Sequence, residues 1–372
     1  MNTTDKLVLL PIQIIEQDNG VILRRGVEQI LIPDNNALLI MRVIQKCLMQ
    51  APQQLDEVLN LFAGPVRPLI AGLIEHLIQK RFVVYLDADM APAETETKPE
   101  TPQDIFYWHF NQHQHTIATV LNEKTWLFAG INCLNQQLLQ AMLAEGLDNY
   151  AIVDDPMLRN IDFFDDAHAL LPGFWDSQRE RILPEDTLFD AEPDAIAAYG
   201  FVVAASEFGS AFLLERWNEF AVTRGLGFYP ALLQNLVGYA GPLVIPHETA
   251  CLACLAERRN SHSSHFGERR LTEPHAFAGQ SVAAWHNVML QTLAAVAAFD
   301  LVKFKANIQW EVGTLCQIDL LAGSMTRRKL LKAPRCPVCS GLHGRPLVNI
   351  HTQLTSNEAW EEIRETVGHH ED

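Results

Sequence analysis

The sequence lacks a long hydrophobic run, and this absence limits the class of protein. Its most apolar stretch, residues 292–299, ends at Asp300, far short of the roughly 20 apolar residues that a membrane-spanning helix needs. The first 17 residues contain no basic segment followed by an apolar core, so they do not resemble a secretory signal peptide. We therefore expect a cytoplasmic protein with no membrane partner.

Positive charge is scarce as well. The chain has 28 lysines and arginines against 45 acidic residues, which gives a net charge of −17. Such a surface repels nucleic-acid phosphates, so we expect no nucleic-acid partner. The hydrophobic fraction of 48% is that of a globular protein. A length of 372 residues predicts two or three domains, because a single core rarely grows this large.

The first 87 residues have the pattern of a small winged-helix unit. Apolar and polar residues alternate in three short runs, and three helical segments and a closing strand follow them. Asp34, Pro52 and Pro65 stand near the expected helix starts. The predicted strands lie at 12–16, 21–25, 28–32 and 82–86.

Composition predicts the remaining organisation. A polar, proline-containing stretch indicates a linker, and strands that alternate with helices beyond it indicate an α/β doubly wound domain. A strand at 126–129, a helix at 134–144 and a strand at 150–153 form the expected βαβ unit. The predicted limits are 88–103 for the linker, 104–351 for the α/β domain and 352–372 for a C-terminal tail.

The chain has few cysteines, but four of its seven form two Cys-x-x-Cys pairs. Two such pairs supply four thiolates at tetrahedral reach, the ligand set of a closed structural zinc site. Cys251, Cys254, Cys336 and Cys339 are therefore predicted to bind Zn²⁺, with no position left for a catalytic water. The competing interpretation is two unrelated or redox-active pairs.

A second group of residues follows the first strand of the βαβ unit. A phosphate-binding loop needs glycines for close backbone approach and an unoccupied helix N-terminus. Here only Gly130 stands at a glycine position, while Asn132 and Asn135 replace the other two. Asp154 lies near the distance expected for a ribose-binding acid. We interpret this as a degenerate nucleotide site, for which bound ATP is not expected.

The N-terminal unit invites three interpretations. Its third helical segment, 65–81, is apolar and has few basic residues, which disfavours DNA recognition. A peptide added as a strand beside 28–32, with the third helix lining the groove, fits better. A structural module that binds nothing is the other alternative. The predicted peptide contacts are Glu28, Ile30, Ile32, Val66, Ile70 and Leu73.

Two stretches of the α/β domain resemble the ThiF-like fold of ubiquitin-activating enzymes. Residues 201–259 resemble the passage from the crossover helix to the first zinc hairpin, and 320–340 resemble the second hairpin. The segment 241–254, with Gly-Pro-Leu ahead of the first cysteine pair, is close to the pattern in precursor-peptide-binding proteins of azole-containing peptide biosynthesis. Those proteins join a small winged-helix module to a ThiF-like domain, and the resemblance covers almost the whole chain.

This resemblance implies a function. Such proteins bind the leader of a ribosomal precursor peptide, as in bacteriocin maturation, and present it to a YcaO-family cyclodehydratase that installs azolines. No YcaO segment is visible, so that partner is expected to be a separate chain, and this one a scaffold subunit that is not an enzyme on its own. ThiF-like domains also commonly form homodimers. Active relatives carry an arginine motif after the ribose acid, which Arg159 matches only in part.

Two further functions remain open from the sequence. ThiF-like proteins of the same two-part architecture adenylate a peptide carboxylate and cyclise the peptide unaided, in which case Asp154 and Arg159 belong to an unusual ATP site. The other is a winged-helix DNA-binding regulator with a zinc domain, which the net charge disfavours.

Overall fold

The computed structural model describes residues 6–85, 101–110, 112, 114–262 and 284–341. The chain divides into two compact units, Met1–Ile117 and Ala118–Asp372. Most of the predicted linker and all of the predicted C-terminal tail lie outside the described residues, so these limits stay predictions.

The N-terminal unit contains a three-stranded antiparallel sheet in the order β2-β3-β4. The three alternating runs form these strands, each within one residue of the predicted limits. Gly20 is required at the first turn, because a Cβ there would lie 2.2 Å from the Ile32 carbonyl oxygen. In the described part of the chain β4 pairs only with β3, so it is an edge strand. The strands span Gln13–Gln17, Gly20–Arg25 and Glu28–Ile32.

A second small sheet of this unit, in the order β5-β1-β6, was not predicted as such. Strand β1 escaped prediction because its four residues end before Pro11 and show no turn signal.

The first helix starts after Asn36 rather than at Asp34, whose carboxylate instead accepts the Asn36 backbone N–H at 2.7 Å. The element order agrees with the prediction, but the winged-helix interpretation itself stays a prediction. The elements are β1 Lys6–Leu9, α1 Ala37–Gln50, β5 Gln53–Gln54, α2 Leu55–Leu59, η1 Gly64–Val66, α3 Arg67–Gln79, β6 Val83–Tyr85, α4 Pro102–His109 and α5 Gln114–Leu121, the last of which runs across the division between the units.

The C-terminal unit is built on an eight-stranded sheet in the order β14-β13-β12-β11-β10-β7-β8-β9. The strands from β11 to β9 run parallel, and β12, β13 and β14 extend the sheet by antiparallel pairing. The predicted βαβ unit is present as β7, α6 and β8. The strands are β7 Thr125–Ala129, β8 Tyr150–Asp154, β9 Ile182–Pro184, β10 Tyr199–Ser206, β11 Gly227–Gln234, β12 Val237–Ala240, β13 Thr314–Asp319 and β14 Ser324–Lys329.

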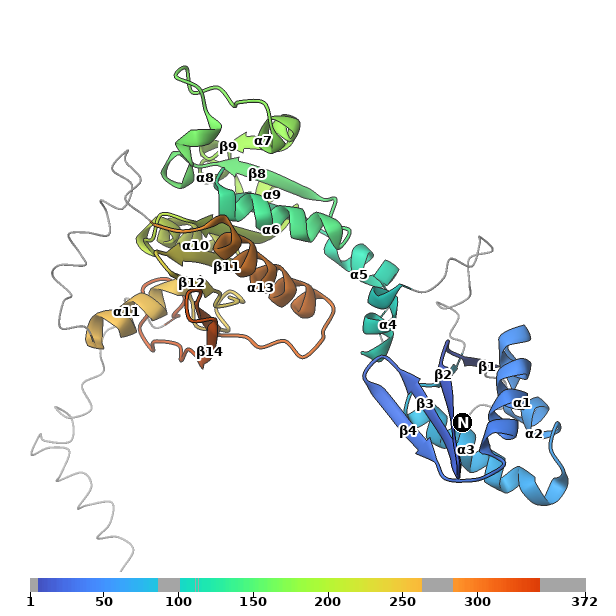
Figure 1. Cartoon of the computed structure of the whole chain (residues 1–372). Coiled ribbons are helices and arrows are strands. Elements are labelled where there is room, and N and C mark those ends of the chain that lie inside the picture. Colours follow the sequence, from blue (N-terminus) through green and yellow to red (C-terminus); the bar gives the residue numbers. More distant parts are fainter. Residues whose placement is uncertain (1–5, 86–100, 111, 113, 263–283, 342–372) are drawn as a thin grey trace, which may run out of the picture. The chain divides into compact units, whose positions relative to one another are not determined.

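Helices cover both faces of this sheet (Figure 1). Helices α6 (Cys133–Ala144) and α13 (Asn287–Lys305) lie side by side and pack on one face, while α10 (Phe212–Thr223) packs on the other. The central strands are therefore buried on both sides and read as continuous apolar runs. Helix α13 is long and apolar enough to span a membrane by composition, a test that core helices also pass, and seven of its residues are buried in the unit.

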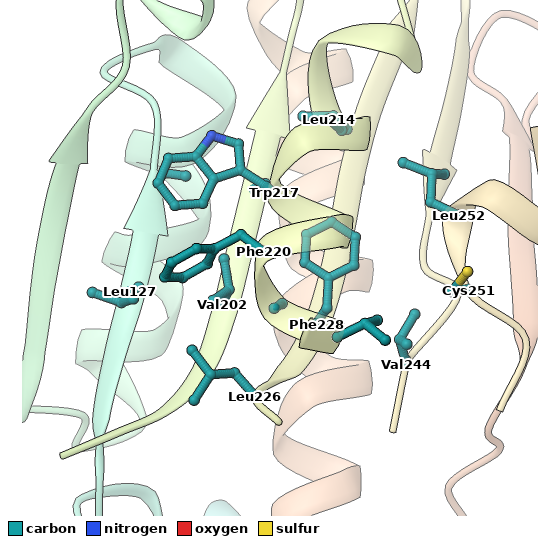
Figure 2. Close-up of a cluster of buried hydrophobic side chains, with 14 of the residues drawn as sticks. Leu127, Val202, Leu214, Trp217, Phe220, Leu226, Phe228, Val244, Cys251 and Leu252 are labelled. Carbon is teal, nitrogen blue, oxygen red and sulfur yellow. The ribbon is translucent and has the colours of Figure 1, made fainter. Parts of the chain in front are cut away.

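Figure 2 shows the core beneath α10, where Trp217 and Phe220 pack against Leu127 and Val202 of the sheet. This cluster continues to the four buried cysteines, so the predicted zinc site belongs to the main core. The remaining short elements are η3 Pro156–Leu158, η4 Ile161–Phe163, α7 Phe174–Ser177, η5 Arg179–Arg181, α8 Asp186–Phe189, α9 Pro193–Ile196 and α11 Leu252–His262.

Candidate functional site

The structure brings the four predicted zinc ligands together. Cys251 immediately precedes α11 and Cys254 lies in its first turn, while Cys336 and Cys339 lie in the segment after β14. All four side chains are buried, with at most 1% exposed. The Asn218 side chain on α10 accepts the Leu252 backbone N–H at 3.0 Å, which fixes the first pair against the core.

The spacing of the sulfurs fits a tetrahedral metal ion. All four Sγ atoms lie within 4.8 Å of one another. Sγ of Cys251 lies 3.9 Å from that of Cys254 and 3.6 Å from that of Cys336, and the Cys254 and Cys339 sulfurs are 3.4 Å apart. Metal–sulfur bonds of about 2.3 Å in a tetrahedron place sulfurs about 3.8 Å apart. The cluster is therefore consistent with structural zinc.

The surroundings of Cys254 favour its thiolate form. The Cys251 thiol and the Ala333 backbone N–H both donate to its sulfur, the latter at 3.3 Å. The hydrogen bond from the Cys251 thiol chiefly lowers the pKa of Cys254, to about 4, and burial opposes the decrease. The same hydrogen bond, together with burial, raises the pKa of Cys251. A buried thiolate requires a compensating positive charge, which a bound Zn²⁺ supplies.

The predicted nucleotide loop lies at the carboxyl edge of the sheet, between β7 and β10. Here the connections to the neighbouring strands diverge in opposite directions, which is where doubly wound sheets bind their ligands. Gly130 has φ +106°, and a Cβ there would lie 2.8 Å from the Leu158 Cβ and from the Asn132 amide nitrogen, so only glycine fits.

The two asparagines fill this loop from within. Asn132 is fully buried and caps α6, since its Oδ1 accepts the Asn135 backbone N–H at 2.9 Å. Its Nδ2 donates to the Leu158 and Ala205 carbonyl oxygens at 2.9 and 2.8 Å. Nδ2 of Asn135 donates to the Gly130 carbonyl oxygen at 2.7 Å. The space that glycines leave open in a nucleotide-binding loop therefore holds hydrogen-bonded amides.

A carboxylate occupies the start of helix α6, a feature that the sequence did not reveal. Glu207 follows β10, is fully buried, and accepts the Leu134 backbone N–H at 2.8 Å. Its other oxygen accepts the Asn160 side-chain amide at 2.7 Å. Burial raises the pKa of Glu207, while these donors oppose the increase. Burial and the neighbouring Glu207 also raise the pKa of Cys133 to about 12.

The predicted ribose acid has a partner of its own. Asp154 accepts two hydrogen bonds from the Arg159 guanidinium, at 2.6 and 2.5 Å. This bidentate pairing raises the pKa of Arg159. The adjacent Asp155 is fully buried and accepts the Trp217 indole N–H at 2.7 Å. The loop after β7 and the acid at the end of β8 follow neighbouring strands, and the start of α6 and the acid are both bound by the chain's own groups.

The predicted peptide contacts divide into two groups. Ile30 and Ile70 are 7% and 0% exposed and belong to the core of the N-terminal unit, so a peptide cannot reach these two side chains. Strand alternation and helical spacing each identify two faces of an element. At these two positions the prediction took the buried face for the exposed one. Val66 is 38% exposed, and the remaining three are half-buried. These four, Glu28, Ile32, Val66 and Leu73, stay predicted contacts.

Glu207 could have been suspected from one signal. A serine and a glutamate end an otherwise apolar strand of eight residues, and polar residues at the carboxyl ends of buried parallel strands commonly line a site. Its partnership with α6 spans 73 residues of sequence and could not be inferred from local pattern.

No family model matches the sequence, and no curated protein sequence matches it. Solved structures do match the fold. The chain is similar to E. coli MccB determined with AMPCPP and MccA (14% identity, TM-score 0.63), covering 90% of this chain and all of MccB. It is also similar to the heterocyclase TruD (14% identity, TM-score 0.58), covering 94% of this chain and 47% of TruD.

A heterocyclase determined with substrate and cofactor is similar as well, at 14% identity and a TM-score of 0.55, over 91% of this chain and 40% of that one. At these identities the likeness shows a common fold. The chain therefore has the ThiF-like α/β fold of MccB and of the heterocyclase TruD, with a cluster of four buried cysteines.

Proposed function

We propose that this protein binds the leader of a ribosomal precursor peptide and acts as a non-catalytic partner of a YcaO-family cyclodehydratase that forms azolines. The fold it shares with the heterocyclase TruD and with MccB, the latter determined with MccA, supports a role in peptide modification. By capturing the leader, the protein raises the effective concentration of the peptide core at the partner's active site. Zinc, held by the four cysteines, is structural in this proposal.

The occupied start of helix α6 carries the non-catalytic part of the proposal. A nucleotide phosphate at this place would have to displace the Glu207 carboxylate from the Leu134 N–H and leave Asn160 without its acceptor. Leaving each buried polar group unsatisfied costs about 1–3 kcal/mol. The buried Asn132 amide would also have to leave two carbonyl oxygens. The internal hydrogen bonds of Glu207 and Asn132 therefore oppose nucleotide binding at the start of α6.

The edge strand β4 supports the peptide-binding part. Its outer backbone groups are not paired with another strand in the described residues, and so they are available to an added peptide strand. Gln29 and Leu31 are exposed along it, with Leu31 57% exposed. An exposed leucine on an edge strand is an aggregation risk unless a partner covers it.

A second candidate is an enzyme that adenylates and cyclises a precursor peptide without a partner. One observation favours it: the likeness covers the full length of MccB, which was determined with AMPCPP, but only about half of TruD. In this case Asp154 and Arg159 would have to separate and contact the nucleotide. Their two hydrogen bonds make the pair an obstacle to that role in the present arrangement.

Calorimetry on the zinc-loaded protein tests the proposal. We expect no heat with ATP and Mg²⁺, and saturable binding, with a Kd of roughly 1 µM or below, of a leader peptide encoded beside the gene. Val66→Glu should weaken peptide binding about tenfold through charge at a predicted contact. Leu39→Glu is the matched control, since Leu39 is 67% exposed on α1, outside the predicted groove.

Three other outcomes would each contradict a different part of the proposal. Saturable ATP binding, together with peptide-dependent ATP–pyrophosphate exchange, would overturn the non-catalytic assignment. Equal peptide affinities for wild type and Val66→Glu would reject the predicted groove, and no peptide binding at all would reject the leader-binding function. Homodimer formation and a cytoplasmic location remain part of the proposal and are checked by light scattering and cell fractionation.

A further inference from the structure

A large cavity opens at the amino edge of the parallel strands, opposite the edge that carries the degenerate nucleotide site. Its volume is about 710 Å³. Residues just before β7, just before β10 and just after α10 line it, together with the last residue of α13. Pockets for small organic ligands commonly measure about 300–1,000 Å³, so the size is that of a small-molecule site.

Three cations converge on this cavity in a protein of net charge −17. Lys124 is exposed, while Arg224 and Lys305 are half-buried, and none of the three forms an ion pair within the described residues. Glu123 is the acidic residue on the wall. Burial chiefly lowers the pKa of Lys305, attraction from the Glu123 carboxylate opposes the decrease, and repulsion from Lys124 adds to it, so one acidic and two basic groups act on one another across this cavity.

Helix dipoles explain part of this arrangement. Arg224 is the C-cap of α10, and Lys305 ends α13, and cations are favoured at helix C-termini. This accounts for a positive charge at each helix end. It does not account for Lys124, which precedes a strand, nor for a hollow between the three groups. Lys303, in the last turn of the same helix as Lys305, by contrast contacts the Asp300 carboxylate at 2.9 Å.

The floor of the cavity is apolar. Leu226 belongs to the main core and is 4% exposed, as Figure 2 shows at the lower end of the cluster. Tyr199 adds a half-buried ring. Lys305 lies over the Trp126 ring, 5.4 Å from its centroid, so its ammonium group is held over the sheet rather than free in solvent. A ligand with a charged head and an apolar body would satisfy both kinds of surface.

We infer that this cavity is a binding site for a small organic anion that carries a phosphate or two carboxylates next to an apolar or aromatic body. Lys124, Arg224 and Lys305 contact the charged head, and Tyr199 and Leu226 contact the body. The planar guanidinium of Arg224 suits either head group, because it donates two parallel hydrogen bonds. The site is separate from the leader-binding function, so either can fail without the other.

Binding of two simple probes to the full zinc-loaded chain tests this site. Phenyl phosphate and phenylsuccinate carry the two possible heads, and benzyl alcohol is the uncharged comparison. Titration calorimetry or ligand-observed NMR should show a Kd of about 1 mM or below for one or both anions, and at least tenfold weaker binding of benzyl alcohol. Whichever anion binds more tightly identifies the head group.

Substitutions locate the binding. Arg224→Gln and Lys305→Met should each weaken it about tenfold or more, and Met at 305 keeps the packing on Trp126. Lys124→Gln changes an exposed side chain, so it provides the same binding test if either of these variants fails to fold. Arg328→Gln is the control with the same change of charge, on the exposed strand β14. The inference is overturned if neither anion binds up to about 10 mM, or if Lys124→Gln and Arg328→Gln bind equally well.

Discussion

The C-terminal unit contains two buried polar centres of opposite character. At the carboxyl edge of the sheet the asparagines, Glu207 and the backbone of α6 satisfy one another's hydrogen bonds almost completely. At the cysteine cluster four buried sulfurs surround a point where a tetrahedral ion fits.

This difference separates a cluster that a bound ion would complete from a loop whose hydrogen bonds are made within the chain. A site that needs a ligand leaves groups that only the ligand can satisfy, because buried charge without a partner is costly. At the start of α6, by contrast, amides and one carboxylate of the chain itself occupy the hydrogen-bonding positions. The ion and the nucleotide should therefore differ sharply in their effect on stability.

The largest effect is expected at the cysteines. Cys336→Ser should abolish stoichiometric zinc and lower the Tm by roughly 10 °C or more, because structural zinc contributes directly to folding. Elemental analysis and a thermal scan measure the two quantities. Cys316→Ala is the matched control, a buried cysteine outside the cluster. Unchanged zinc content in Cys336→Ser would show that the four thiols do not form one site.

A smaller effect is expected at the start of α6. Glu207→Ala should lower the free energy of unfolding by about 2–3 kcal/mol, because the Leu134 N–H and the Asn160 amide lose their acceptor in a buried place. Urea unfolding measures this, with Glu219→Ala on the exposed face of α10 as the control. A variant as stable as the wild type would mean that the Glu207 carboxylate contributes nothing to stability. A ligand could then displace it from the start of α6 without loss of stability.

The smallest effect concerns pH. Because burial raises the folded-state pKa of Glu207 above its ordinary value of 4.5, the folded state holds this proton more tightly than the unfolded state. Its contribution to stability is then fully present below pH 4.5 and declines as pH rises through the folded pKa, by about 1.4 kcal/mol for each pKa unit.

Glu207→Gln removes this titration. The free energy of unfolding of the wild type minus that of the variant should therefore decrease between pH 4.5 and pH 7, as measured by urea unfolding at both values. Other carboxylates cancel in this difference, and Glu219→Gln supplies the control. A constant difference across this range would show that Glu207 titrates alike in the folded and unfolded states.

The sequence was sufficient where the signal is local. The two Cys-x-x-Cys pairs predicted the cluster in full, because each pair constrains its own sulfurs over four residues. The βαβ unit and the replaced glycines were also predicted, since apolar periodicity and loop chemistry are read over short windows.

The sequence was insufficient where partners are distant or faces are ambiguous. Strand β1 pairs with β5 and β6, which lie more than 40 residues away, and no local feature announces it. Ile30 and Ile70 are core residues because alternation identifies two faces of an element but not which one the core covers. Glu207 needed the three-dimensional neighbourhood of α6 before its role was apparent.

The two cysteine pairs are separated by 85 residues, so the ribosome synthesises the first pair well before the second. A ribosome that adds about 5–20 residues per second completes the second pair about 4–17 s after the first. During that interval Cys251 and Cys254 have no metal-binding partners from their own chain and are open to oxidation or to capture by another metal-binding protein. The cellular supply of zinc during synthesis should therefore influence the yield of folded protein more strongly than the supply afterwards.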